Sequence, residues 1–194
     1  MRKTIILIGI ILFISCKTEN NKTEKLTSEL PQVNDQFQSF IDQFPEIKLP
    51  IKIKGCEDDF QPLTELKKEI SSPYEKEPYY VFGKIPTNGN YVATITIGAA
   101  DCFLPILTTY KLNGERIDSK TIAIGGCGQG PCFECEELME IDKELNIYTA
   151  NNLKYYDCDE DYNEIKGTEK IKTIYKSGKL TEKGFVELTN ELEK

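Results

Sequence analysis

The sequence predicts a mainly β (α+β) fold: an antiparallel β-meander of about seven to nine strands with one or two short N-terminal helices, stapled by disulfides. Three observations indicate this fold. From Tyr79 onward, apolar residues alternate with polar ones through eight short segments. Short turn sequences that contain glycine separate most of these segments, and connections this short join antiparallel neighbours. Six cysteines, an even number, lie between residues 56 and 158.

A helix and an edge strand are predicted at the start of the folded domain. The apolar residues of the segment 37–44 recur at i, i+3, i+4 and i+7, which is the spacing of one helix face. Asn34 is placed to cap this helix and Pro45 to end it. Residues 47–53 then alternate between apolar and polar, as in a strand. Pro50 within this segment predicts that the strand lies at a sheet edge.

A second short helix and eight further strands complete the predicted domain. Leu63, Leu66 and Ile70 have helical spacing. The strands are expected at residues 79–85, 91–98, 103–112, 116–125, 137–142, 145–150, 169–176 and 183–189. Turns between strands are expected at Asn88-Gly89, Asn113-Gly114, Gly125-Gly126 and Ser177-Gly178. The pattern leaves open whether the meander forms a barrel, a sandwich or part of a propeller-like sheet.

The first fifteen residues have the order of a secretory signal. Two positive residues begin the segment, an apolar run follows over residues 5–14, and the small residue Ser15 stands before Cys16. The apolar run is about ten residues long, whereas a helix that crosses a bilayer needs about 20. A permanent transmembrane helix is therefore not expected here.

The sequence FISC, residues 13–16, resembles the lipobox of bacterial lipoproteins, in which an aliphatic, a variable and a small residue precede a cysteine. In that family the cysteine is acylated and becomes the N-terminus after cleavage. The resemblance implies that residues 1–15 are removed and that Cys16 is the lipid attachment point. In Gram-negative members, Asp after the cysteine retains the protein at the inner membrane. Lys17 at this place therefore implies the outer membrane, at its periplasmic face or on the cell surface.

The segment after the cysteine predicts a flexible tether. Residues 17–32 are polar and charged, with only Leu26 and Leu30 to bury, so ordering them would gain little free energy. The chain is therefore expected to divide into a signal peptide (1–15), a lipidated N-terminus with its tether (16–33) and a single β-rich globular domain (34–194).

Charge and composition exclude several classes of function. The formal net charge of −8 becomes −10 once the two basic residues of the segment 1–15 are removed. An acidic surface repels phosphate backbones, so no nucleic-acid partner is expected, whereas a basic protein partner would be attracted. The chain has no histidine, which removes the commonest general base and metal ligand. We predict no catalytic residue, and the protein is not expected to be an enzyme.

The six cysteines after Cys16 are candidates for three disulfides, as is typical of an exported chain. Fifteen pairings are possible, and the sequence does not choose among them. The candidates are Cys56, Cys102, Cys127, Cys132, Cys135 and Cys158.

The cysteines at residues 127–135 also have the spacing of metal-binding and redox sites. With Cys158, its spacing matches the ligand pattern of plant-type ferredoxins, and four cysteines also suit a zinc site. Cys132 and Cys135 form a C-x-x-C pair of the kind found in thiol–disulfide enzymes. Neighbouring glutamates would raise a thiol pKa there, however, and a secreted chain crosses the membrane unfolded, without a loaded cluster. Structural disulfides are therefore favoured.

An acidic segment predicts at most one cofactor site. Asp157, Asp159 and Asp161 stand two residues apart, like the start of a calcium-binding loop. Tyr162 and Thr168 then occupy the places at which an EF-hand requires Gly and Glu. The segment is expected to be either a looser Ca²⁺ site or a solvated acidic loop held by its cysteine, and no other cofactor is expected.

These features together predict a lipid-anchored protein of the bacterial envelope with a binding or scaffolding role. Its two-helix start and β-meander resemble those of small β-rich envelope lipoproteins. Besides the membrane, which it contacts through its N-terminal lipid, its expected partner is a basic protein. The alternative is an immunity-type or inhibitor-type lipoprotein that neutralises an envelope-targeting toxin or enzyme.

Overall fold

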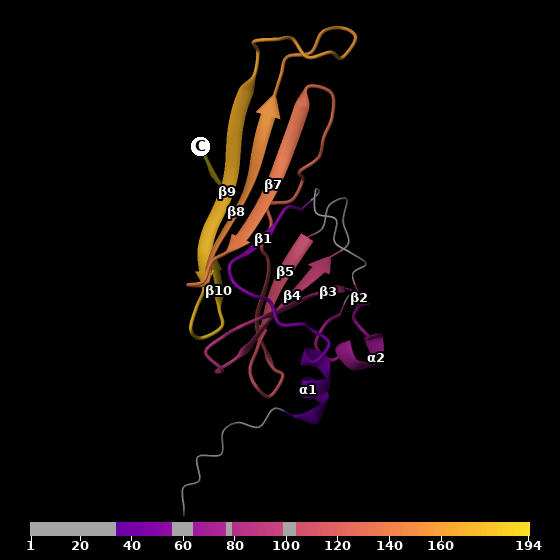
Figure 1. The fold of residues 1–194 in the computed structure, drawn as a ribbon, viewed down its shortest axis with the longest axis vertical. Coiled ribbons are helices and arrows are strands. Elements are labelled where there is room, and N and C mark those ends of the chain that lie inside the picture. The colour runs from indigo at the N-terminus through magenta and orange to yellow at the C-terminus, as the bar shows by residue number, and fades with distance from the viewer. Residues whose placement is uncertain (1–33, 56–63, 77–78, 99–103) are drawn as a thin grey trace, which may run out of the picture. The chain divides into compact units, whose positions relative to one another are not determined.

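Two antiparallel sheets pack against a shared apolar core in the computed structural model (Figure 1). The structure describes residues 34–55, 64–76, 79–98 and 104–194, all within one structural unit, Pro31–Lys194. Sheet A has the strand order β2-β3-β4-β5-β6. Sheet B has the order β1-β7-β8-β9-β10, and β11 also pairs with β9.

The elements have the following bounds. The helices are α1 (Asp35–Ile41) and α2 (Lys68–Ser71). Sheet A contains β2 (Thr64–Glu65), β3 (Tyr80–Ile85), β4 (Val92–Gly98), β5 (Leu104–Tyr110) and β6 (Arg116–Thr121). Sheet B contains β1 (Ile51–Ile53), β7 (Phe133–Ile141), β8 (Asn146–Tyr155), β9 (Lys170–Leu180), β10 (Val186–Leu188) and β11 (Leu192–Glu193).

This arrangement confirms the predicted fold class, an antiparallel, mainly β domain with two short N-terminal helices. The eight strands predicted from the period-two pattern correspond to β3 through β10. The strand that directly follows Pro50, β1, lies at the edge of sheet B, where it pairs only with β7. The sequence left open a barrel, a sandwich or part of a propeller-like sheet, and the two sheets that share one core form a sandwich.

The core between the sheets explains the alternation of the strands. On β4, Ala93, Ile95 and Ile97 are buried in it, and on β7 Met139 and Ile141 are buried from the opposite side. Full burial of an aliphatic side chain of this size contributes about 1.5–3 kcal/mol. The sandwich therefore depends on side chains from segments that are far apart in sequence.

The first helix covers the outer face of sheet A. The Asn34 side chain accepts a hydrogen bond of 2.7 Å from the Phe37 backbone N–H, which confirms the predicted cap. Phe37 and Phe40 pack around Tyr110 of β5, with ring centroids 5.5 and 5.6 Å from its ring. Neither helix in the described ranges is long and apolar enough to cross a membrane.

Two local predictions are corrected by the structure. Ser177-Gly178 is not a turn but lies inside β9, where Gly178 pairs with both β8 and β10. A Cβ at Gly178 would lie 1.7 Å from the Glu187 carbonyl oxygen, so this glycine allows the close approach of β10. The second helix is also shorter than predicted: it begins only at Lys68, because Leu66 belongs to the extended segment that pairs with β3.

Four tight connections in the described ranges have the same five-residue turn geometry. The first residue of each donates its N–H to the carbonyl of the fifth, and the fourth donates to the carbonyl of the first. The fourth residue adopts a positive φ, as in hairpin loops that end in a G1 bulge. The turns are residues 111–115, 142–146, 159–163 and 181–185. The fourth position holds glycine in two of them but Leu145 and Tyr162 in the others.

A buried carboxylate holds the segment after α2 on sheet A. Glu75 accepts a hydrogen bond of 2.5 Å from the Tyr110 hydroxyl and pairs with Arg116 at 3.2 Å. Arg116 also donates to the Tyr74 carbonyl oxygen. Burial nevertheless raises the pKa of Glu75, because the removal from water outweighs the stabilising effect of these partners. The pKa of Tyr110 is raised as well, first by burial and then by the Glu75 charge.

The raised pKa of Glu75 predicts a pH dependence of stability. The folded state binds the Glu75 proton more tightly than the unfolded chain, so this contribution is largest at low pH and is lost as pH rises through the raised pKa. The unfolding free energy of wild type minus that of Glu75→Gln is expected to increase as pH falls from neutrality toward 4.5, the ordinary pKa of a glutamate. Urea unfolding at several pH values measures this difference, and exposed Glu69→Gln is the matched control. A wild-type-minus-variant difference that is independent of pH would contradict the prediction.

Candidate functional site

Exposed apolar side chains gather around the loop that joins β8 to β9, residues 156–169. Of the six large apolar side chains that are exposed in the described ranges, four lie in or beside this loop. Tyr162 and Ile171 are each 73% exposed, and Tyr155 and Ile165 are exposed to a smaller extent. We call these four residues, with the acidic side chains of the loop, the β8–β9 surface. Grouped exposed apolar residues of this kind typically mark a binding surface.

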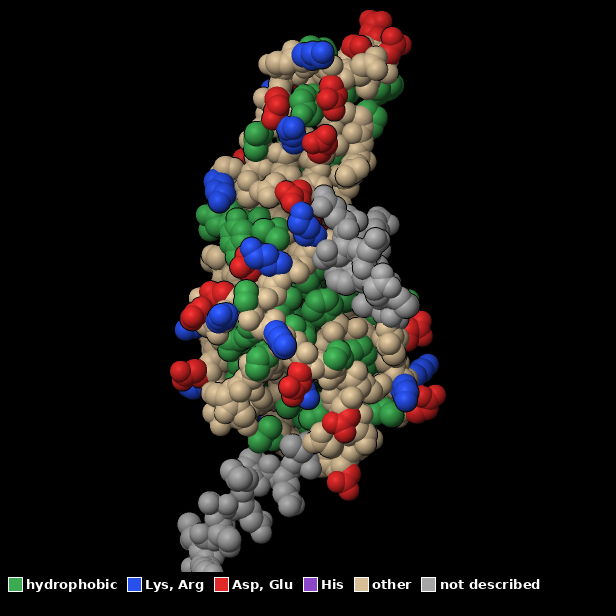
Figure 2. All heavy atoms as spheres, viewed as in Figure 1, with side chains coloured by type: hydrophobic (Ala, Val, Ile, Leu, Met, Phe, Trp, Pro, Cys, Tyr) green, Lys and Arg blue, Asp and Glu red, His purple; other side chains and the backbone are tan. Residues whose placement is uncertain are grey.

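The same loop is strongly acidic. Figure 2 shows acidic side chains gathered at the end of sheet B where this loop lies. The acidic residues of the segment 157–164, all exposed, are Asp157, Asp159, Glu160, Asp161 and Glu164. Apolar groups surrounded by charge are typical of the rim and centre of a protein–protein contact. The charge at this surface favours a basic partner.

A charged rim also surrounds Ile171 on the adjoining face of sheet B. Lys154 lies 3.8 Å from Glu134 and 3.7 Å from Glu169, so its ammonium group bridges two carboxylates. A hollow of about 390 Å³ is lined by Ile171, Lys154, Glu134 and Asn152 among others. The apolar side chain thus stands beside a polar depression, which offers a partner both an apolar contact and hydrogen-bonding groups.

Two disulfides pin this end of sheet B. Cys132 is bonded to Cys158 of the loop, and Cys127 is bonded to Cys135 of β7. The predicted disulfides are confirmed for these four cysteines. Cys16, Cys56 and Cys102, the other cysteines singled out in the sequence, lie outside the described residues.

The pairing bears on the other interpretations of the cluster. The two cysteines of the C-x-x-C motif are bonded to different partners and not to each other. A sulfur in a disulfide is neither a thiolate nucleophile nor a thiolate ligand. The structure therefore favours structural disulfides over an iron–sulfur cluster, a zinc site or a redox dithiol.

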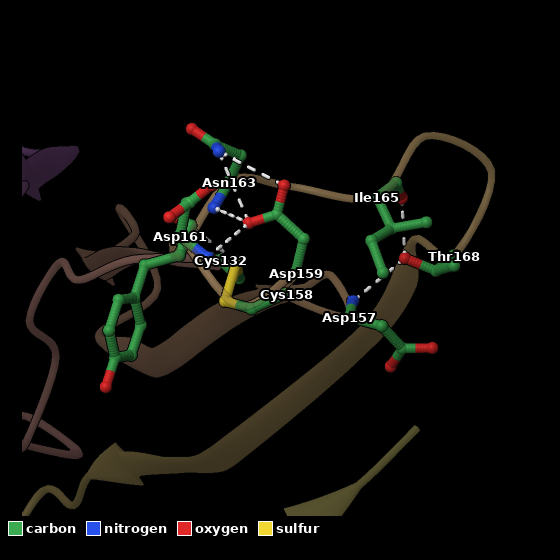
Figure 3. Close-up of a disulfide and its surroundings, with 9 residues drawn as sticks. Cys132, Asp157, Cys158, Asp159, Asp161, Asn163, Ile165 and Thr168 are labelled. Carbon is green, nitrogen blue, oxygen red and sulfur yellow. Dashed lines mark hydrogen bonds between the residues drawn. A yellow bond between two sulfur atoms is a disulfide. The ribbon is translucent and has the colours of Figure 1, made fainter.

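The aspartates of the proposed calcium site are held in different ways (Figure 3). The Asp159 carboxylate accepts hydrogen bonds from the backbone N–H groups of Asp161 and Asn163, at 2.9 and 2.8 Å, and from the Asn163 amide. The hydrogen bonds from Asn163, with a smaller one from Asp161, lower the pKa of Asp159. Asp157 instead pairs with Lys170 at 3.0 Å. Within the described ranges no group of three or more acidic or cysteine side chains is placed to hold a metal ion, so the calcium site stays a prediction.

Sequence reasoning predicted none of the four apolar residues of this surface, and Tyr162 among them has an unusual backbone conformation. Its φ is 62°, in the left-handed region, which costs an L-residue about 1–2 kcal/mol. Leu145 occupies the same place in the β7–β8 turn, but its side chain packs against the core. Tyr162 is exposed and gains no comparable burial. The repeated spacing Asp-x-x-x-Asn, at 142–146 and 159–163, is the sequence signal that would have predicted this turn.

The Cys132–Cys158 disulfide lies in contact with the turn at residues 159–163. The Cys132 sulfur lies 3.9 Å from the Tyr162 carbonyl oxygen, so the bond to Cys158 contacts the turn that presents the tyrosine (Figure 3). The Cys132 backbone carbonyl also accepts a hydrogen bond of 2.9 Å from the Tyr156 N–H. The β8–β9 surface is therefore preorganised where the loop leaves β8, because Tyr156 and Cys158 are both bound to Cys132.

Removal of each disulfide is expected to have a different effect. The Cys132–Cys158 bond joins residues 26 apart and the Cys127–Cys135 bond joins residues eight apart. In the chain-entropy model these bonds contribute about 3–4 and about 2–3 kcal/mol to the unfolding free energy. Replacing each pair by serines and measuring urea unfolding tests this order.

Limited proteolysis distinguishes a local from a global effect. Cleavage within residues 157–169 is expected to accelerate in the variant that lacks Cys132–Cys158. The variant that lacks Cys127–Cys135 is the matched control and should retain slow cleavage there. Equal cleavage rates in both variants would show that the loop does not depend on its own disulfide.

Comparison of this chain with protein-family models, with curated proteins and with solved structures returns no match. Its functional assignment therefore rests on its own residues and their arrangement.

Proposed function

We propose that this protein is a non-catalytic, lipid-anchored binding protein of the bacterial envelope. Its Cys16 lipid holds it at the outer membrane, and the β8–β9 surface binds a protein partner with a basic surface. The observation that carries the proposal is the exposed Tyr162 side chain in a left-handed backbone conformation. The lipobox-like sequence before Cys16 supports the anchor.

The backbone strain at Tyr162 points to a contact residue. Strained conformations of non-glycine residues concentrate at binding and active sites, where the side chain gains something that the fold alone does not supply. Glycine fills the same place in the turns at 111–115 and 181–185. A tyrosine in this place is explained by a partner that buries its ring, because Tyr is among the residues that dominate binding energy at interfaces.

The rigidity of the surface supports the same function. A disulfide, an aspartate-capped turn and strand pairing with β9 all restrict the loop before any partner arrives. A preorganised loop loses less conformational entropy on binding, which increases affinity. The scaffold of two sheets would then serve to present this surface to its partner.

The second candidate function is that of an immunity or inhibitor protein against a basic, envelope-targeting toxin or enzyme. The specific observation in its favour is the acidic charge beside Tyr162, at Asp159, Glu160 and Asp161. Opposite charges on two proteins accelerate their encounter, which suits a protein that must capture its target quickly. A tight one-to-one complex with a basic toxin or enzyme would favour this candidate over a scaffold.

Replacing Tyr162 by glycine separates strain from contact. Glycine adopts the left-handed conformation without steric cost, so Tyr162→Gly is expected to raise the unfolding free energy by about 0.5–1 kcal/mol. The same change is expected to weaken partner binding, because the ring is lost. Urea unfolding and quantitative crosslinking in intact cells measure the two effects. Phe185→Ser, on the exposed β9–β10 turn, is the matched control. Crosslinking that Tyr162→Gly leaves unchanged would contradict the proposed surface.

Replacing Cys16 by serine tests the anchor independently of any partner. Wild-type protein extracted from membranes is expected to have the mass of residues 16–194 plus acyl chains. Cys16→Ser is expected to lack the acyl mass and to leave the membrane fraction, since each buried acyl CH₂ contributes about 0.8 kcal/mol to membrane binding. Intact mass spectrometry and fractionation give the result. A Cys16→Ser protein that remains firmly membrane-bound would exclude this cysteine as the anchor.

A further inference from the structure

Three buried oxygen atoms on the inner face of sheet B have no hydrogen-bond partner among the described residues. They are Glu137 Oε2, Thr149 Oγ1 and Asn151 Oδ1. Their residues are only 4%, 0% and 3% exposed. Buried polar atoms are nearly always paired, so these three unpaired oxygens require an explanation.

The strand register brings these residues together. Glu137 of β7 lies directly opposite Asn151 of β8. Thr149 is two residues before Asn151, so all three side chains are on the same face of the sheet. This is the face that carries Met139 and Ile147 into the core. The three oxygens therefore belong to neighbouring side chains on the inner face of β7 and β8.

A glycine of the loop after β6 holds two of these side chains in place. The Gly125 N–H donates to Glu137 Oε1 at 3.0 Å, and the Asn151 amide donates to the Gly125 carbonyl at 2.9 Å. Each side chain thus binds the loop through one polar atom, which leaves Glu137 Oε2 and Asn151 Oδ1 unpaired. The backbone at Gly55 also lies close to the Glu137 carboxylate, because a Cβ at this glycine would be 2.1 Å from Glu137 Oε2.

The carboxylate distinguishes this cluster from an ordinary hydration site. A buried water would satisfy the hydrogen-bonding capacity of the three oxygens but would supply no counter-charge for an ionised Glu137 carboxylate. No lysine or arginine of the described ranges forms an ion pair with Glu137. A buried ionised carboxylate without a counter-charge is strongly unfavourable. Carboxylate, amide and hydroxyl oxygens together are the ligands that hard cations prefer.

We propose that Glu137, Asn151 and Thr149 form a site for a monovalent alkali cation, Na⁺ or K⁺. One carboxylate carries one negative charge, so a monovalent cation balances the site, whereas a divalent cation would leave a buried positive charge. The site lies on β7 and β8, apart from the acidic segment 157–161. A bound cation would fix the Gly125 loop against sheet B, next to the Cys127–Cys135 disulfide. It would thereby stabilise the sheet that presents the β8–β9 surface.

Thermal unfolding of the mature lipidated protein in detergent tests the proposal. The Tm is measured in NaCl, KCl, CaCl₂ and choline chloride at equal ionic strength, because choline is too large for the site. Wild type is expected to melt several degrees higher in NaCl or KCl than in choline chloride. Glu137→Gln, which removes the charge but keeps the shape, is expected to lose this difference. Exposed Glu136→Gln is the matched control and should retain it.

A second variant keeps the test decisive if Glu137→Gln does not fold. Thr149→Val is isosteric and removes one ligand oxygen, so it is expected to require several-fold more alkali salt for the same rise in Tm. Equal Tm values in alkali and choline salts would overturn the proposal in favour of a buried water. So would an alkali effect that survives in Glu137→Gln, or stabilisation by Ca²⁺ alone.

Discussion

The pairing of β7 with β8 is the constraint on which both the core and the candidate surface depend. The two strands are in register over nine residue pairs, so every second side chain of β7 faces inward opposite a partner on β8. Along this single face the chemistry changes in steps. Ile141 and Met139 fill the core, Glu137 meets Asn151, Cys135 bears a disulfide, and Phe133 pairs with Tyr155. A shift of one residue would expose all of these side chains at once.

The gradient along β7 connects stability with function. At the Ile141 end of β7, burial of aliphatic side chains against sheet A stabilises the fold and requires no specific polar contact. Further along, burial of apolar groups gives way to polar contacts and covalent bonds, and the loop beyond is held by Cys132–Cys158 and by the Asp159 turn. This construction allows apolar side chains such as Tyr162 and Ile171 to stay exposed without collapse onto the core. The same feature makes them available to a partner.

The outer face of sheet A is stabilised differently, by aromatic packing and by one buried carboxylate. There the aromatic side chains of α1 cover Tyr110, and the Tyr110 hydroxyl is satisfied by Glu75. Burying an acidic group is unfavourable, but its hydrogen bond and its ion pair with Arg116 offset much of that cost. Arg116 is the only arginine after Arg2. The chain thus uses this arginine for a contact that positions the segment after α2 on the sheet.

The sequence by itself determined the elements, because local patterns report local structure. Alternation predicted β3 through β10, the i, i+3, i+4 spacing predicted α1 together with its Asn34 cap, and Pro50 predicted an edge strand. Composition predicted disulfides in the cluster at 127–135. The same patterns also misled, since Ser177-Gly178 has the residues of a turn and lies in a strand.

Only the tertiary structure decided which distant segments meet. It stacked the strands as two sheets, chose one pairing of Cys127, Cys132, Cys135 and Cys158 among several, and placed Glu137 beside Asn151 and Gly125. It also showed that Tyr162 is exposed on a left-handed turn. The sheet stacking, the cysteine pairing and the Glu137 contacts have no signal in local sequence, because each depends on residues that are far apart in the chain. The periodicity of a strand determines which side chains face inward, but the packing of two sheets determines what they face.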